Sequence, residues 1–164
     1  MPRVAVARLS PDGSTLITGD DSGVVQFWST APFALRASAK RHTDLISAVA
    51  FLPGSELMAT ASFDGSIGLW NWRTNTFLDA LTGHQGWVTS VTISPDGSRV
   101  VSGGNDGSVK FWSIATRQEL VTFRRHSHTV SGLAFTRDGR FLVSASDEIR
   151  VWRAAAPAEV EGPR

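Results

Sequence analysis

The chain has 164 residues and no cysteine, and its 16 Lys and Arg residues balance 15 Asp and Glu. This length allows one domain with a hydrophobic core, while the balanced charge excludes a global field for nucleic acid or acidic lipid, and the absence of thiols excludes disulfides and thiolate metal sites. No apolar run approaches the ~20 residues that span a bilayer and residues 1–13 do not resemble a signal peptide, so we expect a cytoplasmic protein without a membrane or nucleic-acid partner.

The chain divides into four consecutive stretches that repeat one order of apolar segments and turns: approximately 1–40, 41–82, 83–124 and 125–153. Each stretch opens with a short apolar segment, which a turn rich in Pro, Asp and Gly follows. A second apolar segment, an Asp-Gly turn, a third segment ending on Trp and a weaker fourth segment complete the unit. The first segments contain Val4, Ala7 and Leu9; Ile46, Val49 and Phe51; Val88, Val91 and Ile93; and Val130, Leu133 and Phe135.

The anchor residues of these stretches keep one spacing. Two sets are spaced by 42 residues, namely Trp28, Trp70 and Trp112, and His42, His84 and His126. Trp152 follows Trp112 after 40 residues, because "GGNDGS" at 103–108 is shortened to "ASDE" at 145–148. A fixed period of this size is typical of repeat architectures.

The segments themselves indicate strands. β-Branched and aromatic residues dominate them without a helical period, which predicts four short antiparallel strands per copy, and Asp-Gly turns are strong hairpin signals. One four-stranded sheet cannot bury both faces, whereas sheets packed face to face around an axis can. The sequence therefore predicts an all-β protein of four consecutive four-stranded antiparallel β-propeller blades, with the last blade incomplete and the propeller open or partial.

The two ends of the repeat array are expected to be open. Residues 159–161 could form a weak strand in register with 119–121, but Pro157 and the small residues favour a flexible tail or linker over 154–164. The first strand begins almost at Met1, so we expect no preceding segment to complete the last blade. With about fifteen strands and two apolar end faces, we expect either a fragment of a longer chain or a homodimer that builds a larger ring.

Over residues 3–153 the sequence resembles the WD-repeat (WD-40, β-transducin-like) family. The resemblance rests on Gly83-His84, on the Ser-Pro-Asp-Gly turns at 10–13 and 94–97, on the Asp-Gly turns and on the Trp that ends each third segment. The family's terminal Trp-Asp reads Trp-Ser, Trp-Asn, Trp-Ser and Trp-Arg here. The resemblance implies β-propeller blades and a scaffold that binds another protein or peptide.

The resemblance also implies a structural hydrogen-bonded tetrad in each blade, formed by a His, a strand Ser or Thr, a turn Asp and the Trp. These positions are His42, Thr60, Asp64 and Trp70 in the second blade, and His84, Ser102, Asp106 and Trp112 in the third. The fourth blade has His126, Ser144 and Trp152, with Asp147 left open because its turn is shortened. The first blade lacks the His and has Ser22 at the Asp position, beside Asp21.

His, Ser and Asp together also suggest a catalytic triad, but the same three types recur in successive copies, and an active site has no reason to recur. A buried imidazole that needs hydrogen-bond partners explains the recurrence. The three repeated His residues fall in different blades, too far apart to share one metal ion, and "GGNDG" lacks the Lys-Ser/Thr of a phosphate loop. We therefore expect no enzyme activity, no cofactor and no metal site.

Two aromatic residues stand outside the repeat register. Trp87 precedes the first-segment anchor Val88, and Phe63 precedes the turn residue Asp64. Both belong to loops at one face of the predicted propeller, where they could form a patch with Leu45, because clustered exposed aromatics are typical binding anchors. The alternative is that Trp87 packs over the blade interface. Polar contacts at the edge of this patch are expected from Arg41 and Arg125.

The sequence thus predicts a non-catalytic scaffold or protein–protein interaction module. The alternative is a regulatory propeller segment of a larger multidomain enzyme, such as a kinase or protease. The expected partner is a protein or peptide of unknown identity, in addition to a second copy or the remaining blades of a longer chain.

Overall fold

The computed structural model describes residues 2–153, which form fifteen strands in four separate antiparallel sheets. Blade 1 contains β1 (Val4–Leu9), β2 (Thr15–Asp20), β3 (Val24–Thr30) and β4 (Phe33–Lys40). Blade 2 contains β5 (Ile46–Phe51), β6 (Leu57–Ser62), β7 (Ser66–Asn71) and β8 (Thr76–Thr82). Blade 3 contains β9 (Val88–Ile93), β10 (Arg99–Gly104), β11 (Ser108–Ser113) and β12 (Glu119–Arg124). Blade 4 contains β13 (Gly132–Phe135), β14 (Phe141–Ala145) and β15 (Ile149–Arg153).

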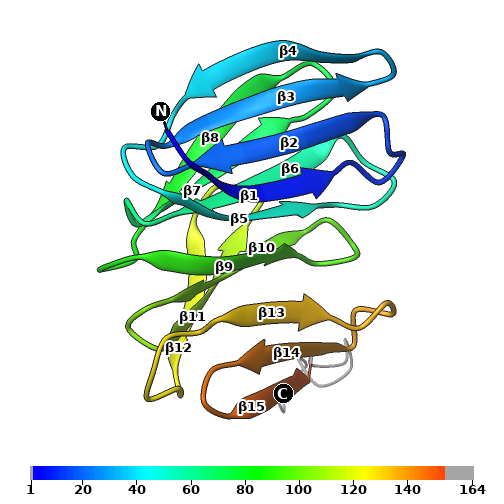
Figure 1. Ribbon diagram of the computed structural model, residues 1–164. Coiled ribbons are helices and arrows are strands. Elements are labelled where there is room, and N and C mark those ends of the chain that lie inside the picture. The colour runs from blue at the N-terminus through cyan, green and yellow to red at the C-terminus, as the bar shows by residue number, and fades with distance from the viewer. Residues whose placement is uncertain (1, 154–164) are drawn as a thin grey trace.

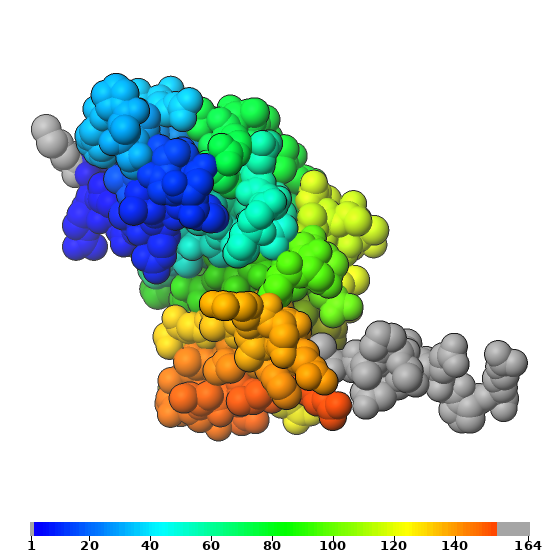
Figure 2. Space-filling view, turned by 90° about the vertical axis from the view of Figure 1, so that its right-hand side faces the viewer, coloured from blue at the N-terminus to red at the C-terminus, as the bar shows by residue number. Residues whose placement is uncertain are grey.

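The strands of each blade lie side by side in chain order, and the first strands of successive blades lie next to one another. The four blades form an open arc, with β1 toward one end and β13 toward the other (Figure 1). The space-filling view shows the same order, with blades 1 and 4 at opposite ends (Figure 2). The predicted all-β open propeller is confirmed, and within residues 2–153 its last blade has three strands. The predicted tail and its weak strand lie outside the described residues.

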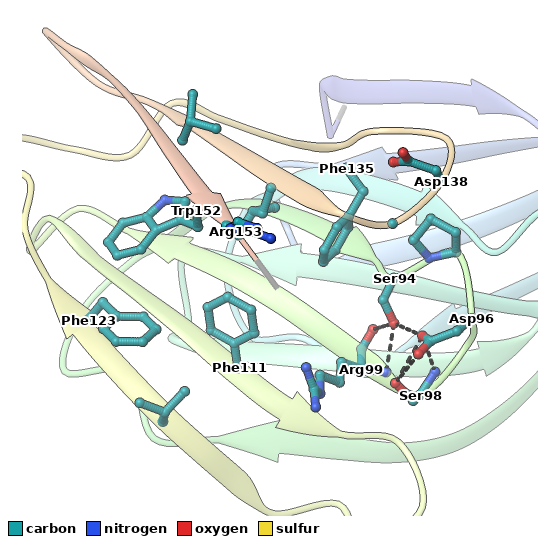
Figure 3. Close-up of a pocket in the computed structure, with 15 residues that line it drawn as sticks. Ser94, Asp96, Ser98, Arg99, Phe111, Phe123, Phe135, Asp138, Trp152 and Arg153 are labelled. Carbon is teal, nitrogen blue, oxygen red and sulfur yellow. Dashed lines mark hydrogen bonds between the residues drawn. The ribbon is translucent and has the colours of Figure 1, made fainter. Parts of the chain in front are cut away.

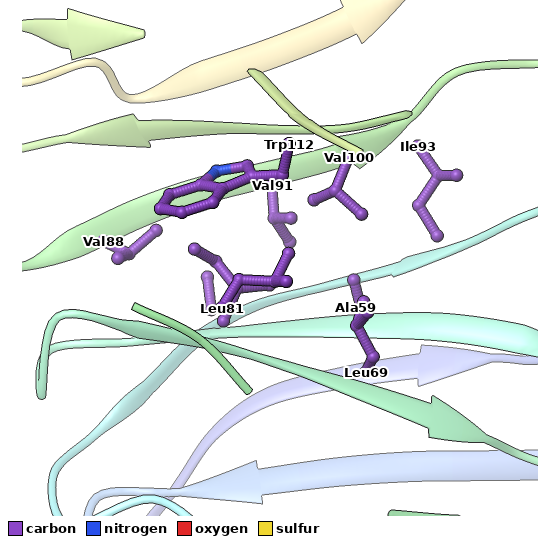
Figure 4. Close-up of a cluster of buried hydrophobic side chains, with 10 residues drawn as sticks. Ala59, Leu69, Leu81, Val88, Val91, Ile93, Val100 and Trp112 are labelled. Carbon is purple, nitrogen blue, oxygen red and sulfur yellow. The ribbon is translucent and has the colours of Figure 1, made fainter. Parts of the chain in front are cut away.

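Three hydrophobic clusters fill the junctions between blades, because the two faces of each sheet point to different neighbours. In β7, Trp70 points toward blade 1 and belongs to a cluster with Phe27, whereas Leu69 points toward blade 3 and joins Val100 and Trp112 (Figure 4). The cluster between blades 3 and 4 is the smallest of the three. Burial between blades therefore provides the core that a single sheet could not form.

Hydroxyl groups in the first strands also join one blade to the next. Ser47 Oγ donates a hydrogen bond to the carbonyl oxygen of Val88, 2.6 Å away in blade 3. At the equivalent position of β9, Thr89 Oγ1 donates to the carbonyl oxygen of Val130, 2.7 Å away at the start of blade 4. The junctions thus share polar contacts as well as apolar ones.

The repeated Asp-Gly turn connects the second and third strands and lies against the loop that enters the next blade. Gly107 has a φ of +73°, which favours glycine. A Cβ at Gly107 would overlap the backbone carbonyl of His126 in the following blade. The turn therefore needs glycine for its backbone conformation and for the close approach of two blades.

Candidate protein-interaction site

Blade 2 contains the complete predicted tetrad. Thr60 Oγ1 lies 2.8 Å from His42 Nε2 and accepts a hydrogen bond of 2.9 Å from Trp70 Nε1. On the other side of the imidazole, Nδ1 lies 3.0 Å from Asp64 Oδ2. Asp64 also accepts hydrogen bonds from the Thr43 backbone N–H and from Ser66. These contacts fit a neutral imidazole that donates through Nδ1 to the carboxylate and accepts the hydroxyl proton of Thr60 at Nε2.

The electrostatics of this network favour the same protonation state. Burial lowers the pKa of His42, although the Asp64 carboxylate raises it in part. Burial opposes ionisation of Asp64, but hydrogen bonds from Ser66 and Thr43 outweigh it and lower its pKa. In the resulting pair, a neutral imidazole lies beside an ionised carboxylate.

Blade 3 has the same His–Ser–Trp core but a different link to its Asp. Ser102 Oγ lies 2.7 Å from His84 Nε2 and accepts from Trp112 Nε1 at 2.8 Å. Asp106 does not hydrogen-bond to the imidazole; Ser108 Oγ donates to Asp106 Oδ1 at 2.6 Å and lies 3.4 Å from His84 Nδ1. Burial lowers the pKa of His84 to about 4. Asp106 therefore acts on His84 across Ser108.

Blade 4 keeps three members of the network. Ser144 Oγ lies 2.7 Å from His126 Nε2 and accepts from Trp152 Nε1 at 2.8 Å. Among the described residues the buried Nδ1 of His126 has no hydrogen-bond partner, and Glu148 Oε1 is 3.6 Å away. Asp147, which the sequence left open, instead pairs with the exposed His128 at 3.0 Å.

Blade 1 contains a turn carboxylate that the sequence reasoning missed. Trp28 Nε1 donates to Thr18 Oγ1 at 3.1 Å. Asp20 Oδ1, rather than a group from Ser22 or Asp21, accepts hydrogen bonds from the Ser22 side chain and from the N–H groups of Ser22 and Val24. The Asp-x-Ser pattern of residues 64–66 and 106–108 also occurs at 20–22, but there it lies two residues further from the Trp, so the repeat register did not point to Asp20.

The geometry of these networks suits a structural role. Thr60, Ser102 and Ser144 are fully buried and already hydrogen-bonded by a His and a Trp. A buried hydroxyl cannot reach the carbonyl or phosphoryl group of a substrate. Within residues 2–153, no group of three or more potential metal ligands comes together, and no helix could cross a membrane.

The two off-register aromatics meet at the face where the loops enter the first strands. Phe63 of blade 2 and Trp87 of blade 3 stack with 4.6 Å between ring centroids and 6° between planes. Trp87 remains 49% exposed, and Phe63 is half-buried. The Phe63 backbone N–H donates to the carbonyl oxygen of Leu45 at 2.9 Å, so Leu45 lies beside the pair. We call Leu45, Phe63 and Trp87 the aromatic patch.

A hollow of about 630 Å³ lies next to the aromatic patch. All four blades contribute to its lining, through Arg3, Leu45, Phe63, Thr89 and Thr129 among others. The two predicted polar contacts are not part of it. The Arg41 guanidinium carbon lies 5.3 Å from the ring centroid of Phe77 in the outer strand β8, and Arg125 is exposed in the loop before His126.

A second pocket, of about 550 Å³, lies between blades 3 and 4 and was not predicted. Phe111, Phe123, Phe135 and Trp152 line it, and Ser94, Asp96 and Arg99 lie at one end (Figure 3). In blade 2, Phe77 of the fourth strand packs edge-on against Trp70 at 5.0 Å. The described part of blade 4 has three strands, so no equivalent side chain covers Trp152 there.

The repeated sheets and their His–Ser/Thr–Trp networks define a β-propeller repeat protein. The family model "WD domain, G-beta repeat" (WD40) matches residues 3–29, 34–71, 75–113 and 117–153, and the chain belongs to this family. Apart from the first, each match begins near the outer strand of one blade and continues through the first three strands of the next. WD40 repeats indicate a protein-interaction scaffold in general, and the family is generally non-catalytic.

A solved structure supports the same fold. A chain in the "Crystal Structure of Mitotic Checkpoint Complex" is similar with a TM-score of 0.84 and 23% sequence identity, over 93% of this chain and 48% of that chain. The present chain therefore spans about half the length of that chain. A comparison with curated proteins found no match.

Proposed function

We propose that this chain is a non-catalytic scaffold that binds a segment of another protein at the aromatic patch. The observation that carries this proposal is the stacked pair of Phe63 and Trp87, with Trp87 still half exposed. Exposing a tryptophan face to water is unfavourable, and exposed aromatics on rigid elements are typical anchors of protein interfaces. Each of these two rings follows or precedes a strand, so its position is fixed before a partner arrives.

The hollow beside the patch gives the bound segment a path across the arc. Leu45 and Phe63 supply an apolar wall, whereas Thr89 and Thr129 supply hydroxyls and Arg3 a positive charge. A segment that places one large apolar side chain against Trp87 and continues over the hollow would meet both kinds of group. The mixed lining favours a peptide over a purely apolar ligand.

The alternative, a regulatory propeller of a larger enzyme, uses the same surface. In that case the bound segment would belong to the enzyme or to its substrate, and the chemistry would reside in another domain. The match to about half of a longer solved chain is compatible with a longer protein. The two proposed functions therefore share the aromatic patch and differ in whether the chain is joined to a catalytic domain.

The proposal is tested with peptides that are selected from a random library for binding to the 164-residue chain. Their affinity is then measured for the unaltered chain and for variants. We expect Trp87→Ala to weaken their binding by roughly 30-fold, which corresponds to about 2 kcal/mol. Leu78→Ala, which truncates a residue 46% exposed in the outer strand β8, is the matched control and should bind normally. Peptides that bind Trp87→Ala as tightly as the unaltered chain would contradict the proposal.

A further inference from the structure

The three junctions between blades bury residues at the same positions of the repeat. The outer faces of blades 1 and 4, at the two ends of the arc, have residues at these same positions. On the third strand, Val25, Ile67 and Val109 are fully buried, each in the cluster shared with the following blade. The equivalent residue of blade 4 is Ile149, which is 74% exposed. Its neighbour Val151, at the position of the buried Leu69, is 64% exposed.

The face of blade 1 at the other end carries the complementary positions. On the second strand, Met58, Val100 and Leu142 are buried in the clusters that they share with the preceding blade. The equivalent Leu16 is only half-buried. On the first strand, Ile93 is 5% exposed, whereas the equivalent Leu9 is 57% exposed. Blade 1 therefore exposes the first-strand and second-strand positions that would pack against the exposed third strand of blade 4.

The hydrogen bond between blades also has a donor position on blade 4 and an acceptor position on blade 1 that are not paired across a junction. Ser47 and Thr89 donate across their junctions to the carbonyl oxygens of Val88 and Val130. Ser131 stands at the equivalent position of blade 4 and hydrogen-bonds within its own blade, at 3.3 Å from the carbonyl oxygen of Ala145. The residue of blade 1 that corresponds to Val88 and Val130 is Val4. A blade 1 placed after blade 4 would thus bring the Val4 carbonyl to the Ser131 hydroxyl.

We propose that the exposed face of blade 4 binds the exposed face of blade 1 of a second copy, and that two chains close one ring through two such contacts. The contact joins two different faces, so it must either close into a ring or continue as a filament. Two arcs of four blades give eight, within the usual size of propellers. The similar solved chain is about twice as long as this one, so one arc fills about half of such a fold.

The association state of the 164-residue chain tests this proposal, because further blades from elsewhere are then absent. Sedimentation velocity at micromolar concentration should show a species of twice the chain mass of 17.6 kDa. Ile149→Asp on blade 4 and Leu9→Asp on blade 1 should each give monomers, since each variant damages both contacts of the ring. Both residues are exposed, so circular dichroism and melting of the two variants should show a folded chain.

An equimolar mixture of the two variants distinguishes this head-to-tail ring from other dimers. One contact then joins the unaltered blade 4 of one variant to the unaltered blade 1 of the other, and a dimer weaker than the original should reappear. Leu120→Asp, at a site 53% exposed on the outer strand β12, is the control and should remain dimeric. A monomer of the unaltered chain, a loss of dimer with only one of the two variants, no recovery on mixing, or species larger than two chains would each overturn the proposal.

Discussion

The ring of Trp87 lies face to face on the ring of Phe63, 4.6 Å between centroids, although the two residues belong to different blades. The stack covers one side of each ring, so the interpretation of Trp87 as packing over the blade junction is correct for that side. The other side accounts for the 49% exposure of Trp87. The same residue therefore contributes to the junction and keeps an exposed side, with which we propose that it binds a partner.

Removing one ring of the stack should have a modest effect on stability. We expect Phe63→Ala to lower the free energy of unfolding by about 1 kcal/mol, because an aromatic pair contributes about 0.5–1.5 kcal/mol beyond its buried area. Phe63→Trp, which keeps an aromatic ring at the position, should retain most of the stability. Urea denaturation measures both. A loss above about 4 kcal/mol for Phe63→Ala would mean that the pair belongs to the core.

The two turn carboxylates should differ in what they contribute. Asp64 contacts His42 Nδ1 and the Thr43 N–H directly, so Asp64→Ala removes the charged acceptor of both donors, leaves the buried Nδ1 only the Ser66 hydroxyl at 3.0 Å, and should cost about 1–3 kcal/mol. Asp106→Ala should cost less, because Ser108 lies between this carboxylate and His84. Thermal and urea unfolding of the two variants compare them. Equal losses, or a larger loss for Asp106→Ala, would argue against this difference.

The buried imidazoles should make the fold sensitive to mild acid. Burial lowers the pKa of His84 to about 4 in the folded chain, against an ordinary value of 6.5. Below pH 6.5 the unfolded chain therefore binds a proton at this histidine that the folded chain does not bind. The contribution of the neutral imidazole to the free energy of unfolding is fully present above pH 6.5 and is lost progressively as the pH falls toward 4. At pH 5 the loss from His84 should be about 2 kcal/mol, and the lowered pKa of His42 adds in the same direction.

Urea unfolding at pH 7.5, 6 and 5 measures this dependence. The window lies above the ordinary pKa of Asp, which is 3.8, so the carboxylates contribute little to it. His84→Gln should reduce the slope between pH 6.5 and 5. An unfolding free energy that stays constant over that range would show that the imidazoles are not held neutral by the fold.

Blade 4 should open more easily than the inner blades. It shares only the smallest hydrophobic cluster, and the buried Nδ1 of His126 has no hydrogen-bond partner among the described residues. Hydrogen–deuterium exchange should therefore be faster for the amides of β14 than for those of β6, which lies in an inner blade. As a control, the exchange is measured at protein concentrations below and above the range in which the chain self-associates, so that the monomer is compared with the associated form. Equal protection of β6 and β14 in the monomer would contradict this expectation.

The sequence predicted the blades well because their anchors are local and periodic. A Trp that ends a strand, an Asp-Gly turn and a His recur in one register, and the resemblance to the WD-repeat family then implied which of them are the partners of Thr60 and Ser102. The link through Ser108 could not be predicted, since the same residue types stand at these positions in both blades, yet the carboxylate contacts the imidazole at 3.0 Å in blade 2 and only through Ser108 in blade 3.

The surface was predicted less completely than the core. Comparison of the repeats identified Phe63 and Trp87 as unnecessary for the scaffold, but not that they stack. Arg41 was expected beside them, yet its side chain lies over Phe77, because the length of an arginine allows it to reach a neighbouring aromatic ring. The pocket lined by Phe111 and Trp152 depends on which strands cover blade 4, and no sequence motif reports that.

We propose that the buried networks stabilise the fold, whereas the aromatic patch binds the partner. Measuring unfolding free energy and peptide affinity on two variants side by side separates these two roles. Thr60→Val removes the oxygen shared by His42 and Trp70, and we expect a stability loss of at least ~2 kcal/mol with unchanged affinity of the folded protein. Trp87→Ala should do the reverse, with roughly 30-fold weaker binding and a stability loss of no more than about 1 kcal/mol. If Trp87→Ala unfolds the chain while binding by the remaining folded molecules is unchanged, the patch is core and the claim is wrong.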